Sequence, residues 1–211
     1  WPNILSASEL IASALEQNNS VHVFGTGHSH MLAEEMYYRA GGLVRVHPIL
    51  FEGLMLHSSA TLSTSLERLP GLAEALLADH PIAQGDVLIA ASNSGSNAVT
   101  SELVRQARDG GASVIAITSM KHATSSEARP TDLQRLHELA DVVIDNGGCV
   151  GDAAIERGEA GCRRRWRNCA RPSCGWRRCR ARCCCRVNPA SARKWRHVRC
   201  IAAVRAPSVR S

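Results

Sequence analysis

The stretch that decides the fold is residues 86–119, which read DVLIAASNSGSNAVTSELVRQARDGGASVIAITS. Two continuous apolar runs, 86–92 and 113–119, stand on either side of a helical pattern at 97–109. Continuous rather than alternating apolarity indicates strands buried on both faces, as in a parallel sheet covered by helices. The pair Gly110-Gly111 is a suitable stop for the helix between them. We therefore predict a strand–helix–strand unit.

The same alternation continues in both directions along the chain. Further strands are predicted at 20–25, 43–50 and 141–145, and further helices at 4–16, 29–40, 66–78 and 132–140. This order predicts an α/β fold: a doubly wound, five-stranded parallel sheet flanked by helices, with the flavodoxin-like strand order 2-1-3-4-5. Ligands bind such sheets beyond the carboxyl ends of the strands, so the loops there are searched first.

The loop after the first predicted strand, residues 25–30, reads GTGHSH and leads into a helix; we call it the first loop. Gly25 and Gly27 allow close backbone approach to a ligand, and a helix N-terminus attracts anions. His30 stands where a dinucleotide fingerprint needs its third glycine, and no Gly-Lys-Ser/Thr of a Walker A loop follows. A tight strand-to-helix turn without a ligand explains this loop equally well.

The loop after the third predicted strand, residues 92–97, reads SNSGSN; we call it the serine loop. Hydroxyls, amides and backbone N–H groups at a helix N-terminus can surround a phosphate without Lys or Arg. Ordinary capping accounts for one such residue and not for five, which favours phosphate binding. The candidate substrate- and phosphate-binding residues of the two loops are Gly25, Thr26, Gly27, Ser29, Ser92, Asn93, Ser94, Gly95, Ser96 and Asn97.

The first loop, the stretch SNSGSNAVTSELVRQARDGGASVIAITS and a closing DNGG loop together resemble the SIS (sugar isomerase) domain over residues 4–156. The closest likeness is to an uncharacterised phosphosugar-binding branch with the HSH form of the first loop. The resemblance implies a five-stranded parallel sheet, a dimer or tetramer, and a phosphosugar ligand. It also implies that Ser92, Ser94, Ser96 and Asn97 hold the phosphate, and that Gly25, Gly27, His28 and Ser29 line the sugar side.

Interconversion of an aldose and a ketose phosphate needs a base that moves a proton between adjacent carbons through an enediol. His and Glu near the strand ends are the natural candidates, although a lone Glu on a helix usually faces solvent. In order of preference, the candidate catalytic residues are His28, His30, Glu52, His57 and Glu102. Glu34 and Glu35 lie one turn beyond the first loop.

A metal site is the alternative use of these histidines. His28 and His30, with His57 or His122, could bind zinc, and the phosphoheptose type of relative binds a metal. His-x-His at the head of a helix is a weak signal, and the HExxH and CxxC patterns do not occur. We therefore expect neither a metal nor another cofactor.

The 211 residues carry a net charge of +6, which is the sum of an acidic N-terminal segment and a strongly basic C-terminal segment. Residues 1–156 hold 8 Lys+Arg against 18 Asp+Glu, whereas 157–211 hold 17 against 1, with 8 Cys and no Leu. We expect an SIS phosphosugar-binding domain at 1–156 that lacks its C-terminal end, and at 157–211 a disordered tail or frameshift product. With five aliphatic side chains larger than Ala, the tail buries too little apolar area to order itself. Zinc or RNA binding becomes the leading hypothesis if the tail is native.

These features predict a phosphosugar-binding protein, of the aldose–ketose sugar-phosphate isomerase type. A non-catalytic phosphosugar sensor and an amino-sugar-phosphate lyase or etherase stay open as alternatives, and truncation leaves the activity of this chain open as well. The start, WPNILSASEL, has neither a basic region nor a long apolar core, and it lacks an initiator Met, so the sequence could be a fragment. We expect a cytoplasmic homo-oligomer that binds a small-molecule phosphosugar, with no membrane and no specific nucleic-acid partner.

Overall fold

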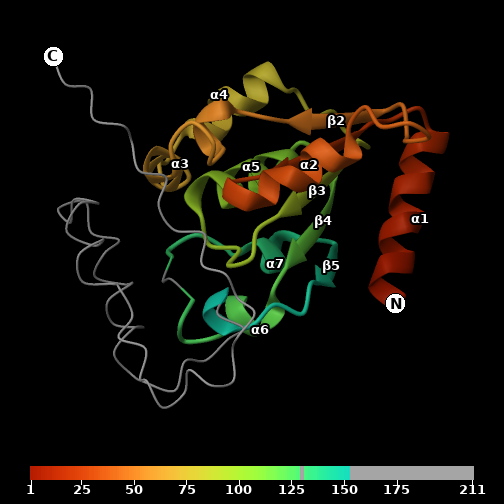
Figure 1. Ribbon diagram of the computed structural model, residues 1–211. Coiled ribbons are helices and arrows are strands. Elements are labelled where there is room, and N and C mark those ends of the chain that lie inside the picture. Colours follow the sequence, from red (N-terminus) through yellow and green to blue (C-terminus); the bar gives the residue numbers. More distant parts are fainter. Residues whose placement is uncertain (129–130, 153–211) are drawn as a thin grey trace, which may run out of the picture. The chain divides into compact units, whose positions relative to one another are not determined.

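The computed structural model describes residues 1–128 and 131–152, which lie in the first of two units, Trp1–Ile155 (Figure 1). The expectations for residues 157–211 lie outside the described residues. No helix in the described ranges combines the length and the apolar character that crossing a bilayer requires.

Five parallel strands form one sheet in the order β2-β1-β3-β4-β5, which confirms the predicted fold (Figure 1). The strands are β1 Val21–Gly25, β2 Val46–Ile49, β3 Val87–Ala91, β4 Ser113–Thr118 and β5 Val142–Asp145. The central strands β1 and β3 are buried at every residue, as their unbroken apolar runs indicate.

Helices cover both faces of this sheet. The α-helices are α1 Pro2–Glu16, α2 His30–Met36, α3 Ala60–Leu66, α4 Leu72–Asp79, α5 Ala98–Asp109, α6 Met120–Ala123 and α7 Leu136–Leu139. Three short 3₁₀ turns are η1 Gly27–Ser29, η2 Glu52–Leu54 and η3 Val150–Asp152. The core accordingly forms two layers, one on each side of the sheet.

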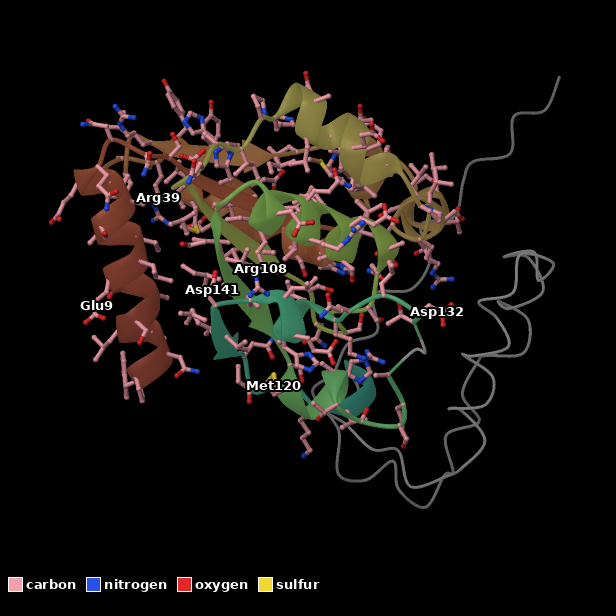
Figure 2. The ribbon with its side chains drawn as sticks, turned by 180° about the vertical axis from the view of Figure 1, so that it is seen from behind. Glu9, Arg39, Arg108, Met120, Asp132 and Asp141 are labelled. Carbon is pink, nitrogen blue, oxygen red and sulfur yellow. The ribbon has the colours of Figure 1, made fainter. Side chains whose placement is uncertain are left out.

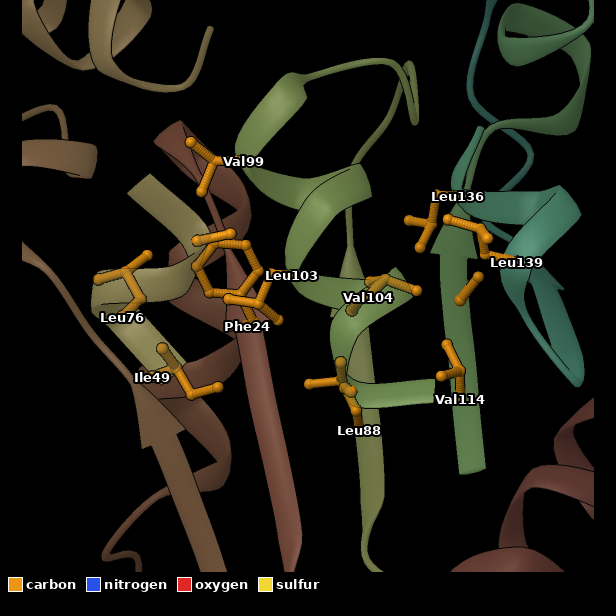
Figure 3. Close-up of a cluster of buried hydrophobic side chains, with 14 of the residues drawn as sticks. Phe24, Ile49, Leu76, Leu88, Val99, Leu103, Val104, Val114, Leu136 and Leu139 are labelled. Atoms are coloured by element: carbon orange, nitrogen blue, oxygen red, sulfur yellow. The ribbon is translucent and has the colours of Figure 1, made fainter. Parts of the chain in front are cut away.

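The two layers follow from the alternation of side chains along each strand. On one face, Phe24 of β1 packs among Leu76 of α4 and Leu103 of α5 (Figure 3). On the other face, Val23 packs against residues of α1 and α2.

Arg108, labelled in Figure 2, donates to the carbonyl oxygen of Leu139 at 3.0 Å and so ties α5 to α7.

The helix predicted at 66–78 is wrong in its first turn, because Pro70 and Gly71 interrupt the chain there. α3 ends at Leu66 and α4 begins at Leu72, with Gly71 at φ 83° between them. Proline restricts the residue before it and lacks an N–H, so the two helices cannot merge.

Two other predicted helices are too long. The helix predicted at 29–40 ends at Met36, because Tyr37 is extended and Tyr38 has φ 50°. The helix predicted at 132–140 is a single turn between two extended residues, Arg135 and Ala140.

A buried hydrogen bond between His22 and Asp86 joins the amino ends of β1 and β3, opposite to the edge where ligands are expected. His22 Nε2 lies 3.0 Å from Asp86 Oδ2, and both side chains are buried. Asp86 also accepts the backbone N–H groups of Ser20 at 2.8 Å and Ala83 at 2.9 Å. Burial lowers the pKa of His22 below 6.5, although its bond to Asp86 opposes the change. Burial alone would raise the pKa of Asp86, but the hydrogen bonds from Ser20, Ala83 and His22 lower it below 3.8.

We predict that acid weakens the fold through this pair. As the pH falls below about 6.5, the unfolded chain takes up a proton at His22 that the folded chain refuses, so the unfolding free energy decreases. Below pH 3.8, Asp86 adds a further loss in the same direction. Urea titrations between pH 7.5 and 5.5 measure the first effect, and His22→Gln should flatten it. The exposed His28→Gln is the matched control, and identical pH slopes in both variants would contradict the prediction.

Candidate functional site

The first loop and the serine loop lie side by side at the carboxyl edge of the sheet. β1 and β3 are hydrogen-bonded neighbours, and Gly25 pairs with Ala91 at their ends. From β1 the chain continues to β2 on one side, and from β3 it continues to β4 on the other. The gap between β1 and β3 is therefore the topological switch point, where doubly wound sheets bind ligands.

The serine loop turns sharply at Gly95. Gly95 has φ +60°, a conformation that side chains rarely adopt, and a Cβ there would lie 3.1 Å from Leu136 Cβ. The Gly95 N–H donates to Ser92 Oγ at 3.1 Å, and the Ser94 and Ser96 hydroxyls are 3.2 Å apart. Successive N–H groups around a left-handed residue form concave anion sites.

Asn97 precedes α5 but does not cap it. Its side chain makes no cap bond to the first turn of α5, a turn that lies wholly within the described residues. It donates instead to Glu67 Oε2 at 2.9 Å. Ordinary capping, the alternative explanation for this polar stretch, therefore does not account for Asn97.

Glu67, which follows α3, joins the two loops. The same oxygen, Oε2, accepts from Thr26 Oγ1 of the first loop at 3.1 Å and from Asn97 of the serine loop at 2.9 Å. Its backbone carbonyl accepts the N–H of Val99 at 3.2 Å. Sequence reasoning missed Glu67, because a single Glu on a helix carries no local signal of a partner 30 or 41 residues away.

The first loop is packed too tightly to accept a side chain at its start. A Cβ at Gly25 would lie 2.5 Å from the carbonyl oxygen of Ser29, so only glycine fits. Gly27 has φ +59°, and its carbonyl oxygen is the partner of His30 Nδ1. A carbonyl can only accept, so Nδ1 carries the proton and a neutral His30 keeps its lone pair on Nε2.

The structure brings two of the five catalytic candidates together. The rings of His30 and His57 meet edge-on with centroids 5.9 Å apart, and His30 Nε2 lies 3.6 Å from Glu34 Oε2. His30 is buried, whereas His57 and Glu34 are exposed. This arrangement places two imidazoles and a carboxylate together at the start of α2.

The structure gives no contact between the other three candidates and this pair of histidines. His28 is exposed on η1, and Glu52 is exposed on η2. Glu102 Oε2 accepts the backbone N–H of Gly71 at 2.8 Å, so this carboxylate anchors the start of α4. Glu102 therefore has a structural role at the junction of α5 with α4.

The closing loop after β5 reaches the serine loop. Asn146 Nδ2 donates to Asn93 Oδ1 at 3.1 Å, and Ser119 Oγ donates to the carbonyl oxygen of Gly148 at 2.8 Å.

No cluster of three or more His, Cys, Asp or Glu suited to a metal occurs among residues 1–128 and 131–152.

The family model of the SIS domain matches residues 1–119. The chain is 44% identical over 153 residues to a UPF0309 protein of Listeria innocua, covering 72% of this chain and 62% of that protein. It is 49% identical over 150 residues to a UPF0309 protein of Brucella anthropi, covering 71% and 61%. The chain thus spans about three fifths of the length of the curated relatives that it matches.

Among solved structures, the chain is similar to a phosphoheptose isomerase from Neisseria gonorrhoeae, with a TM-score of 0.47 and 20% identity, over 68% of this chain and 72% of that one. A phosphoheptose isomerase from Francisella tularensis gives a TM-score of 0.45 and 21% identity, over 64% and 72%.

We predict that Glu67→Ala lowers the unfolding free energy by about 1–3 kcal/mol, because it leaves the Thr26 hydroxyl and the Asn97 amide without their acceptor. Glu67→Gln keeps an acceptor oxygen and should cost less. Guanidinium denaturation measures both changes, with the exposed Glu74→Ala on α4 as control. A Glu67→Ala variant as stable as Glu74→Ala would show that the bridge is unimportant.

Proposed function

Because this chain belongs to the SIS-domain family, we propose that it binds a phosphosugar at the carboxyl edge of its sheet and interconverts its aldose and ketose forms. The observation that carries the proposal is the serine loop beside the first loop at the switch point, joined to it by Glu67. Both the isomerase activity and a sugar phosphate as its substrate are proposed here.

In the proposed complex, the phosphate lies against the serine loop at the N-terminus of α5. Backbone N–H groups, hydroxyls and the dipole of a 12-residue helix favour an anion there. The sugar would extend toward Gly25, Thr26, Gly27 and Ser29 of the first loop. This direction is supported by the adjacency of the two loops, since Gly25 pairs with Ala91.

His30 is the proposed base. The Gly27 carbonyl holds the proton on Nδ1, so Nε2 can accept a proton from the carbon next to the carbonyl group of the sugar. The electron pair of that C–H bond forms the enediolate, whose first oxygen takes up a proton. The hydroxyl proton of the second oxygen is then released to the same donor group, that oxygen becomes the new carbonyl, and the proton held by His30 returns to the neighbouring carbon. Glu34, 3.6 Å from Nε2, favours the imidazolium that forms in between. His57, at a ring separation of 5.9 Å, is the proposed donor to the developing enediolate oxygen.

Self-association is part of the proposal. Large apolar side chains are exposed at several places, among them Trp1, Ile4 and Leu5 at and near the start of α1, and Tyr38 and Val44 between α2 and β2. Apolar groups of this size at a surface favour contact with another protein, and a second copy is the partner proposed. Sedimentation velocity measures it. The cytoplasm is the proposed compartment, supported by Cys149 as the single Cys of residues 1–156.

Binding is tested at the serine loop. We predict that Ser94→Ala and Ser96→Ala each weaken phosphosugar binding by about 1–3 kcal/mol, the range for hydrogen bonds to charged groups. Calorimetry with inorganic phosphate and a panel of sugar phosphates measures the loss. The exposed Ser126→Ala is the matched control, and unchanged affinity in the Ser94→Ala/Ser96→Ala double variant would remove the loop from the site.

Catalysis is tested by proton exchange. We predict that the bound sugar phosphate exchanges its C2 proton with deuterated water, followed by NMR, because an enediol intermediate releases that proton. His30→Gln should slow the exchange about 100-fold or more, the typical contribution of a general base. Binding without exchange in the wild-type chain would reject the isomerase and favour a sensor. An unimpaired His30→Gln variant would assign the base to another residue.

A further inference from the structure

Three consecutive carbonyl groups of the serine loop are held from behind. The Asn93 oxygen accepts from Thr118 Oγ1 at 3.2 Å and from the Ser119 N–H at 3.3 Å. The Ser94 oxygen accepts from Arg135 Nη1 at 3.5 Å. The Gly95 oxygen accepts from the N–H of Leu136 at 3.0 Å. Residues at the end of β4 and at the start of α7 thus bind the carbonyl groups of residues 93–95 of the loop.

These hydrogen bonds fix the direction of the backbone N–H groups of the loop. A trans peptide is planar, and its N–H points opposite to its C=O. Carbonyl groups turned toward β4 and α7 therefore turn the N–H groups of Ser94, Gly95 and Ser96 away from them. The Gly95 N–H then meets Ser92 Oγ at 3.1 Å, and the loop presents a concave, donor-lined side.

Arg135 is itself firmly placed. Its backbone N–H donates to Glu138 Oε2 at 2.7 Å, and the next residue, Leu136, is fully buried in the core. The guanidinium is therefore carried on a short helical turn that packs against the loop, since Leu136 Cβ would lie 3.1 Å from a Cβ at Gly95. The serine loop contains no charged residue of its own.

Charged side chains contact the serine loop at two positions, Asn97 and Ser94. Glu67 contacts the loop at Asn97, so a negative charge lies at one end of the loop. Arg135 contacts the loop at Ser94, within its turn, and places a positive charge there. The guanidinium therefore adds positive charge beside a loop that has no charged residue of its own, which favours an approaching anion.

We propose that Arg135 is a positioning residue that orients the serine loop and adds positive charge that favours binding of a phosphate dianion over a neutral sugar. This inference rests on the proposed function, because it assigns the anion to the serine loop. Its guanidinium acts through the loop: it orients the Ser94–Gly95 peptide and raises the potential at the concave side. The ligand class is a phosphate monoester or inorganic phosphate.

The test is calorimetry of inorganic phosphate against the full chain at several salt concentrations. Arg135→Gln should weaken phosphate binding about tenfold and flatten its salt dependence, since it removes one charge that a bound anion meets. Arg135→Lys keeps the charge and loses the planar donor fork, so it should restore the salt dependence and only part of the affinity. The exposed Arg105→Gln on α5 removes the same charge elsewhere and is the matched control.

Each outcome decides between the inference and the proposed function. If Ser94→Ala and Ser96→Ala weaken phosphate binding but Arg135→Gln behaves like Arg105→Gln, Arg135 has no role and the proposed function stands. If Arg135→Gln lowers the melting temperature and leaves the salt dependence as in the wild type, its role is structural alone, which overturns the inference. If the wild-type chain binds neither phosphate nor any sugar phosphate, both fail. Arg135→Lys supplies the decisive comparison if Arg135→Gln does not fold.

Discussion

The hydrogen-bonded pairing of β1 with β3 is the constraint on which the rest of this structure depends. These two strands are buried on both faces, and they are the neighbours from which the chain departs in opposite directions. Their register places Gly25 beside Ala91, so the loops that follow must share one edge of the sheet. A crevice for a ligand forms at this edge because the chain leaves β1 and β3 in opposite directions.

Around that edge, polar groups from distant segments are arranged so that most of them satisfy one another. Glu67 receives a hydroxyl from one loop and an amide from the other, and β4 and α7 take up the carbonyl groups of the serine loop. Buried polar groups are costly unless they are paired, so these bonds make one loop conformation strongly preferred. A loop fixed in advance does not lose conformational entropy when a ligand binds, which favours affinity.

Hydrogen bonding within the protein also fixes the orientation of His30. Its proton is held on Nδ1 by a carbonyl oxygen of its own loop, and a carboxylate lies on the other side of the ring. The backbone of the first loop therefore selects the tautomer, and the sequence spacing of His30 and Glu34 on one helical turn supplies the counter-charge. In the proposed mechanism, this arrangement gives the imidazole of His30 a defined direction in which to accept a proton.

By itself, the sequence determined the five strands, the parallel sheet and the two loops, because unbroken apolar runs and turn residues act over a few neighbouring positions. It also indicated His30 and the serine-loop residues as candidates. It placed the helix at 66–78 wrongly at its start, where the local break at Pro70-Gly71 outweighed the helical pattern. Only the tertiary structure decided that Glu67 joins Thr26 to Asn97, that Glu102 anchors α4, and that Arg135 lies behind Ser94. These partners are 30 to 41 residues apart, and such contacts arise from the packing of α3, α4 and α7 on the sheet, which no local pattern of residues encodes.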